Sequence, residues 1–171
     1  MVALALVAFP AQALASTSQS SPVGVDQSAA RGAAERAASA AHAYRSSAGT
    51  LLQGYQTRFG SRLTPAESSR VAELTRRGLA ALGTLDRRAQ RTAALARQGA
   101  SATRINAARQ AAIAAHAQAS AQLQAAVTEV QPLLARHLGL FEGLQAKADL
   151  DRSMRELDDV GSTLRAIPVA R

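Results

Sequence analysis

The sequence predicts an all-α fold: an elongated, up-and-down antiparallel helical bundle of three long helices plus a shorter fourth, with coiled-coil-like packing. Alanine supplies 42 of the 171 residues, and only five residues are aromatic. Alanine favours helices and lets them approach closely, but it buries too little apolar surface to fill a thick sandwich or an α/β core. Apolar residues also recur every three or four positions along four segments, as one face of a helix requires. A chain of this length has room for one domain.

The first 15 residues have the pattern of a targeting segment. Residues 2–9 are apolar, Pro10 ends the run, and Ala13-Leu14-Ala15 forms an A-x-A cleavage pattern. We therefore predict a signal peptide over residues 1–15 and an exported protein, periplasmic or extracellular. The apolar run is well short of the roughly 20 residues that span a bilayer. No Lys or Arg precedes it, which leaves two alternatives: a true start codon further upstream, or a weak signal.

Composition then sets the other boundaries. Residues 16–27 are rich in serine, a composition typical of a disordered lead-in. The helical bundle domain is expected over residues 28–166, and residues 167–171 are expected to form a disordered tail. The first helix should cover 28–59, because Gly60 can end it. Its apolar seam, at three-four spacing, consists of Ala34, Ala37, Ala41, Tyr44, Ala48, Leu51 and Tyr55.

The second helix, over residues 64–97, has the clearest local signals. Thr64 and Glu67 form a capping box, with Pro65 at the first helical position. Gly99 can end the helix, and Ser101 can cap the next one. The predicted apolar face consists of Val71, Leu74, Gly78, Leu82, Leu85, Ala89, Thr92 and Ala96.

Arginines gather on the opposite side of this second helix. At about 100° per residue they fall within an arc roughly 120° wide. This arc is the candidate site for an anion or a client protein. Its residues are Arg70, Arg76, Arg77, Arg87, Arg88 and Arg91.

The third helix should begin near Ser101, and Pro132 should kink or break it. The fourth is expected from Leu140 or Gln145 to Arg165. The seam of the third helix is expected to continue into the fourth through Ile113, His116, Ser120, Leu123, Val127, Val130, Leu134, His137, Phe141 and Leu144. The acidic outer face of the fourth helix should pair with its own Arg152 and Arg155, or dock on the arginine arc, within the bundle or from another copy. Its aspartates are Asp149, Asp151, Asp158 and Asp159.

No motif in the sequence predicts catalysis, a cofactor or a metal. The chain lacks cysteine, contains no G-x-S-x-G elbow and has no glycine-rich phosphate loop. His116 and His137 are too far apart along one helix, about 30 Å, to share a metal ion. We therefore expect a non-enzymatic protein whose histidines are structural.

The net charge of the chain indicates which class of partner it can bind. The formal charge is +8, and residues 26–136 hold 15 basic and six acidic groups. Such a surface attracts anionic partners. Nucleic acid fits poorly, because no aromatic residues interleave with the arginines. A membrane surface fits weakly, because the apolar face of the second helix lacks Trp and Phe.

One stretch resembles a known family. Leu63-Thr64-Pro65-Ala66-Glu67, followed by Arg70-Val71-Ala72-Glu73-Leu74, is similar to the L-T-x-x-Q helix start of the Spy/CpxP family. The resemblance implies a small, basic, all-helical periplasmic protein with ATP-independent chaperone activity. Glu67 stands where the family has Gln, and a second copy of the motif is not evident.

Two function classes follow. The first is a structural or protein-interaction module of the cell envelope, which pairs with a protein partner or a second copy through its apolar seams. The second is a periplasmic holding chaperone, or a module for anionic or unfolded clients, that uses the arginine arc.

Overall fold

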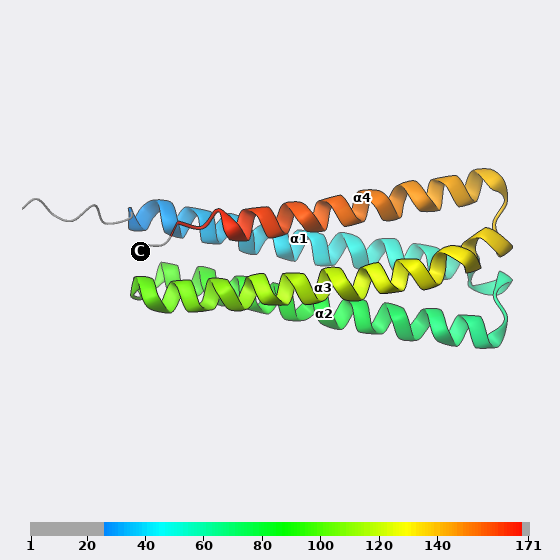
Figure 1. The fold of residues 1–171 in the computed structure, drawn as a ribbon, viewed down its shortest axis with the longest axis horizontal. Coiled ribbons are helices and arrows are strands. Elements are labelled where there is room, and N and C mark those ends of the chain that lie inside the picture. Colours follow the sequence, from blue (N-terminus) through cyan, green and yellow to red (C-terminus); the bar gives the residue numbers. More distant parts are fainter. Residues whose placement is uncertain (1–25, 169–171) are drawn as a thin grey trace, which may run out of the picture.

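The fold is a four-helix bundle, as the sequence predicts. The structure, a computed structural model, describes residues 26–168. Its elements are α1 (Gln27–Phe59), a single 3-10 turn (Gly60–Arg62), α2 (Pro65–Arg97), α3 (Ala102–His137) and α4 (Leu140–Arg165). α1 packs against α2 and α4, and α3 packs against the same two helices, so that α2 and α4 lie diagonally opposite each other (Figure 1). None of these helices combines the length and hydropathy of a membrane span.

The bundle is elongated. Its two ends hold different connections between the helices. One end, the terminal end, holds the start of α1, the end of α4 and the turn between α2 and α3 (Figure 1). The other, the loop end, holds the α1–α2 and α3–α4 connections. Because each connection is short, sequential helices run antiparallel.

The boundaries of the domain differ slightly from those predicted. Asp26 caps α1 by accepting a hydrogen bond from the Ser28 amide at 2.9 Å, so the helix begins at Gln27. Ile167 is only 2% exposed and belongs to the core, so the packed domain extends past residue 166 into the predicted tail. The predicted signal peptide, most of the predicted lead-in and residues 169–171 lie outside the described residues.

Local signals set the start and end of α2 correctly. The Glu67 amide donates to Thr64 Oγ1 at 3.3 Å, and the Thr64 amide donates to Glu67 Oε2 at 3.0 Å. This reciprocal pair is the predicted capping box. After the helix, Gly99 adopts a φ of 66°, which glycine reaches without steric strain, and Ser101 caps α3.

α3 continues through Pro132 as one helix to His137. Proline has no N–H to donate to the carbonyl four residues earlier, so the helix lacks one backbone hydrogen bond there but does not end. The break comes later, at Leu138 and Gly139, and α4 begins at Leu140.

This break makes part of the predicted α3 seam wrong. Phe141 and Leu144 are 85% and 59% exposed. They belong to a new helix that begins at Leu140, so the three-four spacing of α3 no longer predicts which of its residues face the core. In the first half of α3 the most buried residues are Ala112, Ala115 and Ala119, beside the predicted seam, whereas the predicted Ile113 and Leu123 are half-buried and pack against the core. Of the predicted α3 residues, His116 alone is fully buried.

Residue size differs between the two halves of the core. Toward the terminal end, buried alanines of α1, α2 and α3 surround larger side chains of α4. The alanines are Ala33, Ala34, Ala37, Ala38, Ala41, Ala89, Ala93, Ala112, Ala115 and Ala119; the larger side chains are Leu157, Val160 and Leu164, together with Ile167 just after α4. Toward the loop end the interior side chains are mainly Leu, Val, Tyr and Phe, and many are only half-buried. Small residues let the helices approach closely in the first half, whereas bulky residues hold them apart in the second.

Candidate functional site

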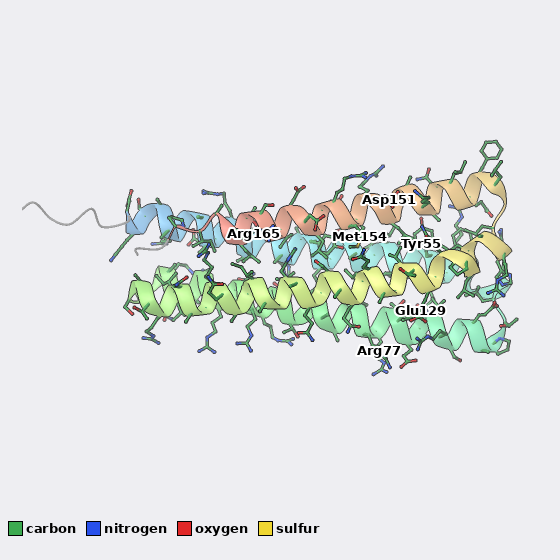
Figure 2. The ribbon with its side chains drawn as sticks, viewed as in Figure 1. Tyr55, Arg77, Glu129, Asp151, Met154 and Arg165 are labelled. Atoms are coloured by element: carbon green, nitrogen blue, oxygen red, sulfur yellow. The ribbon has the colours of Figure 1, made fainter. Side chains whose placement is uncertain are left out.

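All six arginines of the predicted arc are exposed on the outer side of α2. Figure 2 shows side chains along this edge, Arg77 among them, pointing away from the other helices. The apolar face of α2 explains this orientation. Leu74, Leu82 and Leu85 are buried in the bundle, so the residues on the opposite side must face solvent.

The structure divides the arc into two parts. Arg70 makes a two-point contact with Glu129 of α3, at 2.8 Å from Nε and 2.9 Å from the second guanidinium nitrogen. Glu73 lies between Arg70 and Arg77 and accepts from both. The hydrogen bonds to Glu129 raise the pKa of Arg70, and the charge of Arg77 lowers the pKa of Glu73. These two arginines are therefore already matched by carboxylates of the same chain.

The remaining four arginines have no such partner. Within residues 26–168, Arg76, Arg87, Arg88 and Arg91 form no ion pair; Arg87 donates only to the Thr84 hydroxyl, at 3.1 Å. We call these four residues the arginine face of α2. Arg87, Arg88 and Arg91 lie within about one turn, or roughly 6 Å along the axis, and Arg76 lies about three turns away. Their guanidinium groups are free to bind carboxylate or phosphate oxygens in pairs.

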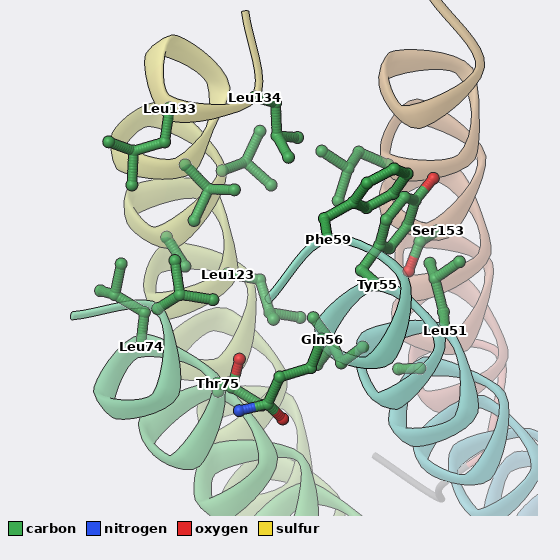
Figure 3. Close-up of a pocket in the computed structure, with 18 of the residues that line it drawn as sticks. Leu51, Tyr55, Gln56, Phe59, Leu74, Thr75, Leu123, Leu133, Leu134 and Ser153 are labelled. Atoms are coloured by element: carbon green, nitrogen blue, oxygen red, sulfur yellow. The ribbon is translucent and has the colours of Figure 1, made fainter. Parts of the chain in front are cut away.

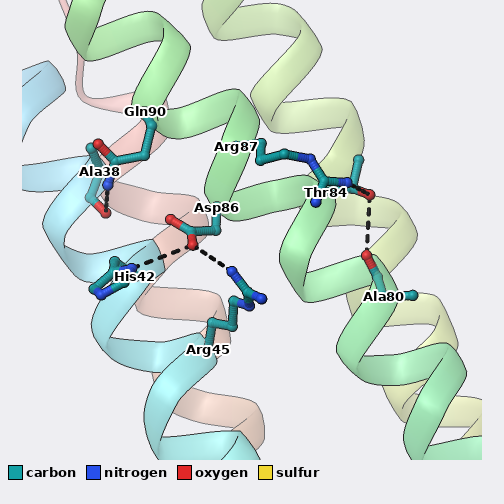
Figure 4. Close-up of polar contacts among 8 residues, drawn as sticks. All are labelled: Ala38, His42, Arg45, Ala80, Thr84, Asp86, Arg87 and Gln90. Atoms are coloured by element: carbon teal, nitrogen blue, oxygen red, sulfur yellow. Dashed lines mark hydrogen bonds and ion pairs between the residues drawn. The ribbon is translucent and has the colours of Figure 1, made fainter.

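The structure contains a buried carboxylate on α2 that was not predicted from the sequence. Asp86 is 5% exposed at the α1–α2 interface. Its Oδ2 accepts from Arg45 at 3.1 Å and from His42 Nδ1 at 3.3 Å, both on α1 (Figure 4). Asp86 follows Leu85 directly, so the helix period placed it at the margin of the apolar face, but nothing in α2 alone indicated its partners. We interpret the cluster as a polar clamp between α1 and α2.

The other two histidines have structural contacts. His116 is buried, and its Nε2 donates to the Leu157 carbonyl of α4 at 2.9 Å. His137 Nε2 donates to Glu67 Oε2 at 3.1 Å, which joins the end of α3 to the start of α2. In the part of the chain that the structure describes, no three His, Asp or Glu side chains are gathered as a metal site would require.

Within a single chain, the acidic face of α4 does not make the predicted contacts. Asp151 pairs with Lys147 at 3.0 Å, and Asp149 accepts from Tyr55 at 2.8 Å, whereas no ion pair of Arg152 or Arg155 is found between residues 26 and 168. The aspartates do not reach the arginine face either, because α4 lies diagonally across the bundle from α2 (Figure 1). Within residues 26–168 of one chain, no acidic surface covers the arginine face.

No family model, curated protein or solved structure matches this chain.

Proposed function

We propose that the protein is a non-enzymatic, exported interaction module that binds an acidic segment of a protein client through the arginine face of α2. One observation carries the proposal: four exposed guanidinium groups share one side of a rigid helix and have no carboxylate partner within the described residues. The charges of Arg87, Arg88 and Arg91, which lie within about one turn, repel one another, so a bound polyanion would relieve the repulsion as well as form new ion pairs.

Because the apolar seams are buried, the arginine face is a better binding surface for a partner than the seams are. The apolar seams of all four helices face one another inside the same chain. A partner that paired through those seams would first have to separate the bundle, whereas a partner on the arginine face would leave it intact. Charge also favours a protein or peptide with carboxylates, because a guanidinium group can bind both oxygens of one carboxylate at once.

The test compares two variants that remove the same number of charges. The first replaces Arg76, Arg87, Arg88 and Arg91 with Gln. The matched control replaces Arg36, Arg152, Arg155 and Arg165, which are exposed on α1 and α4, with Gln. Fluorescence anisotropy with a labelled 20-residue poly-glutamate peptide measures binding at about 0.1 M and about 1 M salt, where the Debye length falls from about 10 Å to about 3 Å.

We expect the first variant to lose at least about tenfold in affinity and the control to lose much less, since only the first removes direct contacts. Wild-type binding should weaken steeply as salt rises. If both variants lose the same affinity, the peptide responds only to net charge and the proposal is wrong. Circular dichroism should show both variants folded, because the substituted side chains are exposed.

A second candidate, a holding chaperone for unfolded clients, is favoured by one observation. Leu140, at 77% exposure, forms an exposed apolar patch on the first turns of α4 together with Phe141 and Leu144. Exposed apolar residues of this size can contact unfolded chains. A reduced, carboxymethylated protein should then bind the wild type, and Phe141→Ser with Leu144→Ser should weaken that binding without affecting poly-glutamate.

A further inference from the structure

The loop end of the bundle contains a partly open hollow that the protein's own side chains leave unfilled. Its volume is about 110 Å³, and residues of all four helices line it. Figure 3 shows leucine side chains of α1, α2 and α3 converging on this space. Half-buried members of its wall include Leu52 of α1, Val71 of α2, Leu134 of α3 and Leu150 of α4.

The difference in residue size between the two halves of the core explains the hollow. At the terminal end, alanines let the helices meet. At the loop end, Tyr55, Phe59 and the leucines of facing helices line the space without filling it. Protein interiors are normally packed without such space, because atoms that face a void lose contacts. The hollow is therefore a local departure from close packing.

The wall is mainly apolar, and the imidazole of His137 within it already donates to Glu67 Oε2 at 3.1 Å. No Asp, Glu, Lys or Arg is among the residues that line the hollow in the described part of the chain. Its main polar groups already have partners: Tyr44 and Ser153 share a hydrogen bond of 3.0 Å, and Tyr55 donates to Asp149 at 2.8 Å. Water would find few hydrogen bonds there, and a charged group would enter without a counter-ion.

We propose that this hollow binds an uncharged, apolar small molecule of about the size of one six-membered ring or a short alkyl chain. The size follows from the volume. A dry apolar cavity of about 150 Å³ in another protein binds benzene, and the hollow here is somewhat smaller. Gln56 and Thr75, seen together between α1 and α2 in Figure 3, form a polar margin to the site. The site lies inside the bundle, apart from the arginine face, and does not depend on the proposed function.

The test uses toluene as the probe and benzoate as its anionic counterpart with the same ring. Isothermal titration calorimetry of the full chain should show saturable toluene binding at one site. Benzoate should bind at least about tenfold more weakly, because its carboxylate would be desolvated without a partner. Absence of saturable toluene binding, or equal affinity for benzoate, would overturn the proposal.

Two substitutions of the same kind locate the binding. Ala126 of α3 lines the hollow and Ala125 beside it is exposed. Ala126→Leu should fill part of the space and weaken toluene binding at least about tenfold, whereas Ala125→Leu should bind like the wild type. Equal binding by the two variants would contradict the proposed location.

A measurement on the wild type keeps the proposal testable if Ala126→Leu does not fold. In methyl NMR spectra, toluene should shift the resonances of Leu52, Val127 and Leu134 and leave Ile105, at the terminal end, unchanged. The opposite pattern would overturn the proposal. If sedimentation instead reveals a dimer that toluene dissociates, a second copy of the chain is the occupant and the small-molecule proposal fails.

Discussion

The imidazole ring of His116 lies directly against Gly161, where α3 crosses α4. A Cβ atom added to Gly161 would come within 2.5 Å of His116 Cε1 and 2.6 Å of Nε2. His116 also donates to the Leu157 carbonyl one turn earlier in α4. The absence of a side chain at Gly161 therefore makes room for a buried hydrogen bond between the two helices.

Gly161→Ala should consequently destabilise the bundle, although alanine is the better helix former. The ring cannot move without losing its bond to Leu157, so we expect overpacking to lower the free energy of unfolding by about 1 to 3 kcal/mol. Urea denaturation measures the change. Gly143→Ala is the matched control in the same helix, since its Cβ would meet nothing within 4 Å, and it should stabilise the protein by up to about 1 kcal/mol. A Gly161→Ala variant as stable as wild type would contradict this account of the contact.

Arg45→Met should destabilise the clamp between α1 and α2. The substitution removes the shorter of the two hydrogen bonds to Asp86 and leaves a buried carboxylate with only His42. We expect a loss of about 1 to 3 kcal/mol in the free energy of unfolding. The double variant with Asp86→Leu should recover much of the loss, because it removes the unpaired charge as well. Arg36→Met, at an exposed position of α1, should have little effect; a similar loss there would show that the clamp is not the cause.

Leu85→Ala should create a cavity in the α2 face of the core. Leu85 is 1% exposed, and truncation at such a site lowers the free energy of unfolding by about 2 to 5 kcal/mol. Leu140→Ala removes the same atoms from an exposed position and should change stability by less than about 0.5 kcal/mol. Chemical denaturation of the two variants compares them directly, and equal effects would mean that the buried face of α2 is misassigned.

Stability should depend on the ionisation of Glu67 in acid. Hydrogen bonds from the Thr64 amide and hydroxyl, followed by the contact with His137, lower the pKa of Glu67 from its usual 4.5 to about 2. A carboxylate whose pKa is lower in the folded state stabilises the fold above its unfolded pKa. That contribution falls progressively as the pH drops from about 5 toward 2.

Glu67→Gln cannot titrate at this position and tests the prediction. The stability difference between wild type and variant, from urea denaturation at each pH, should shrink as the pH falls from about 5 toward 2. A difference that stays constant down to pH 2 would show that the Glu67 carboxylate does not stabilise the fold.

Export is predicted from residues that the structure does not describe. Ala13-Leu14-Ala15 predicts cleavage before Ser16. Intact-mass measurement on protein from an envelope or culture fraction, expressed from its native start codon, should show a chain that begins at Ser16 or at Leu14. A full-length product in the cytosol would contradict the prediction.

Part of the candidate site could be predicted from the sequence. The exposure of all six arginines followed from the period of α2 alone. The contacts of Glu73 with Arg70 and Arg77 have three- and four-residue spacing, so the sequence contained that signal too. The contact between Arg70 and Glu129 spans two helices and had no such signal.

The sequence by itself determined where α2 begins and ends, because the groups responsible lie within a few residues of one another. Thr64 and Glu67 cap α2 through their own side chains, and Gly99 ends the helix through its own backbone. Only the tertiary structure decided the partners of Asp86, the exposure of Phe141 and the hollow at the loop end. Each depends on how far a helix is rotated and shifted against its neighbours. That arrangement is set by all four seams packing at once, so no single segment contains it.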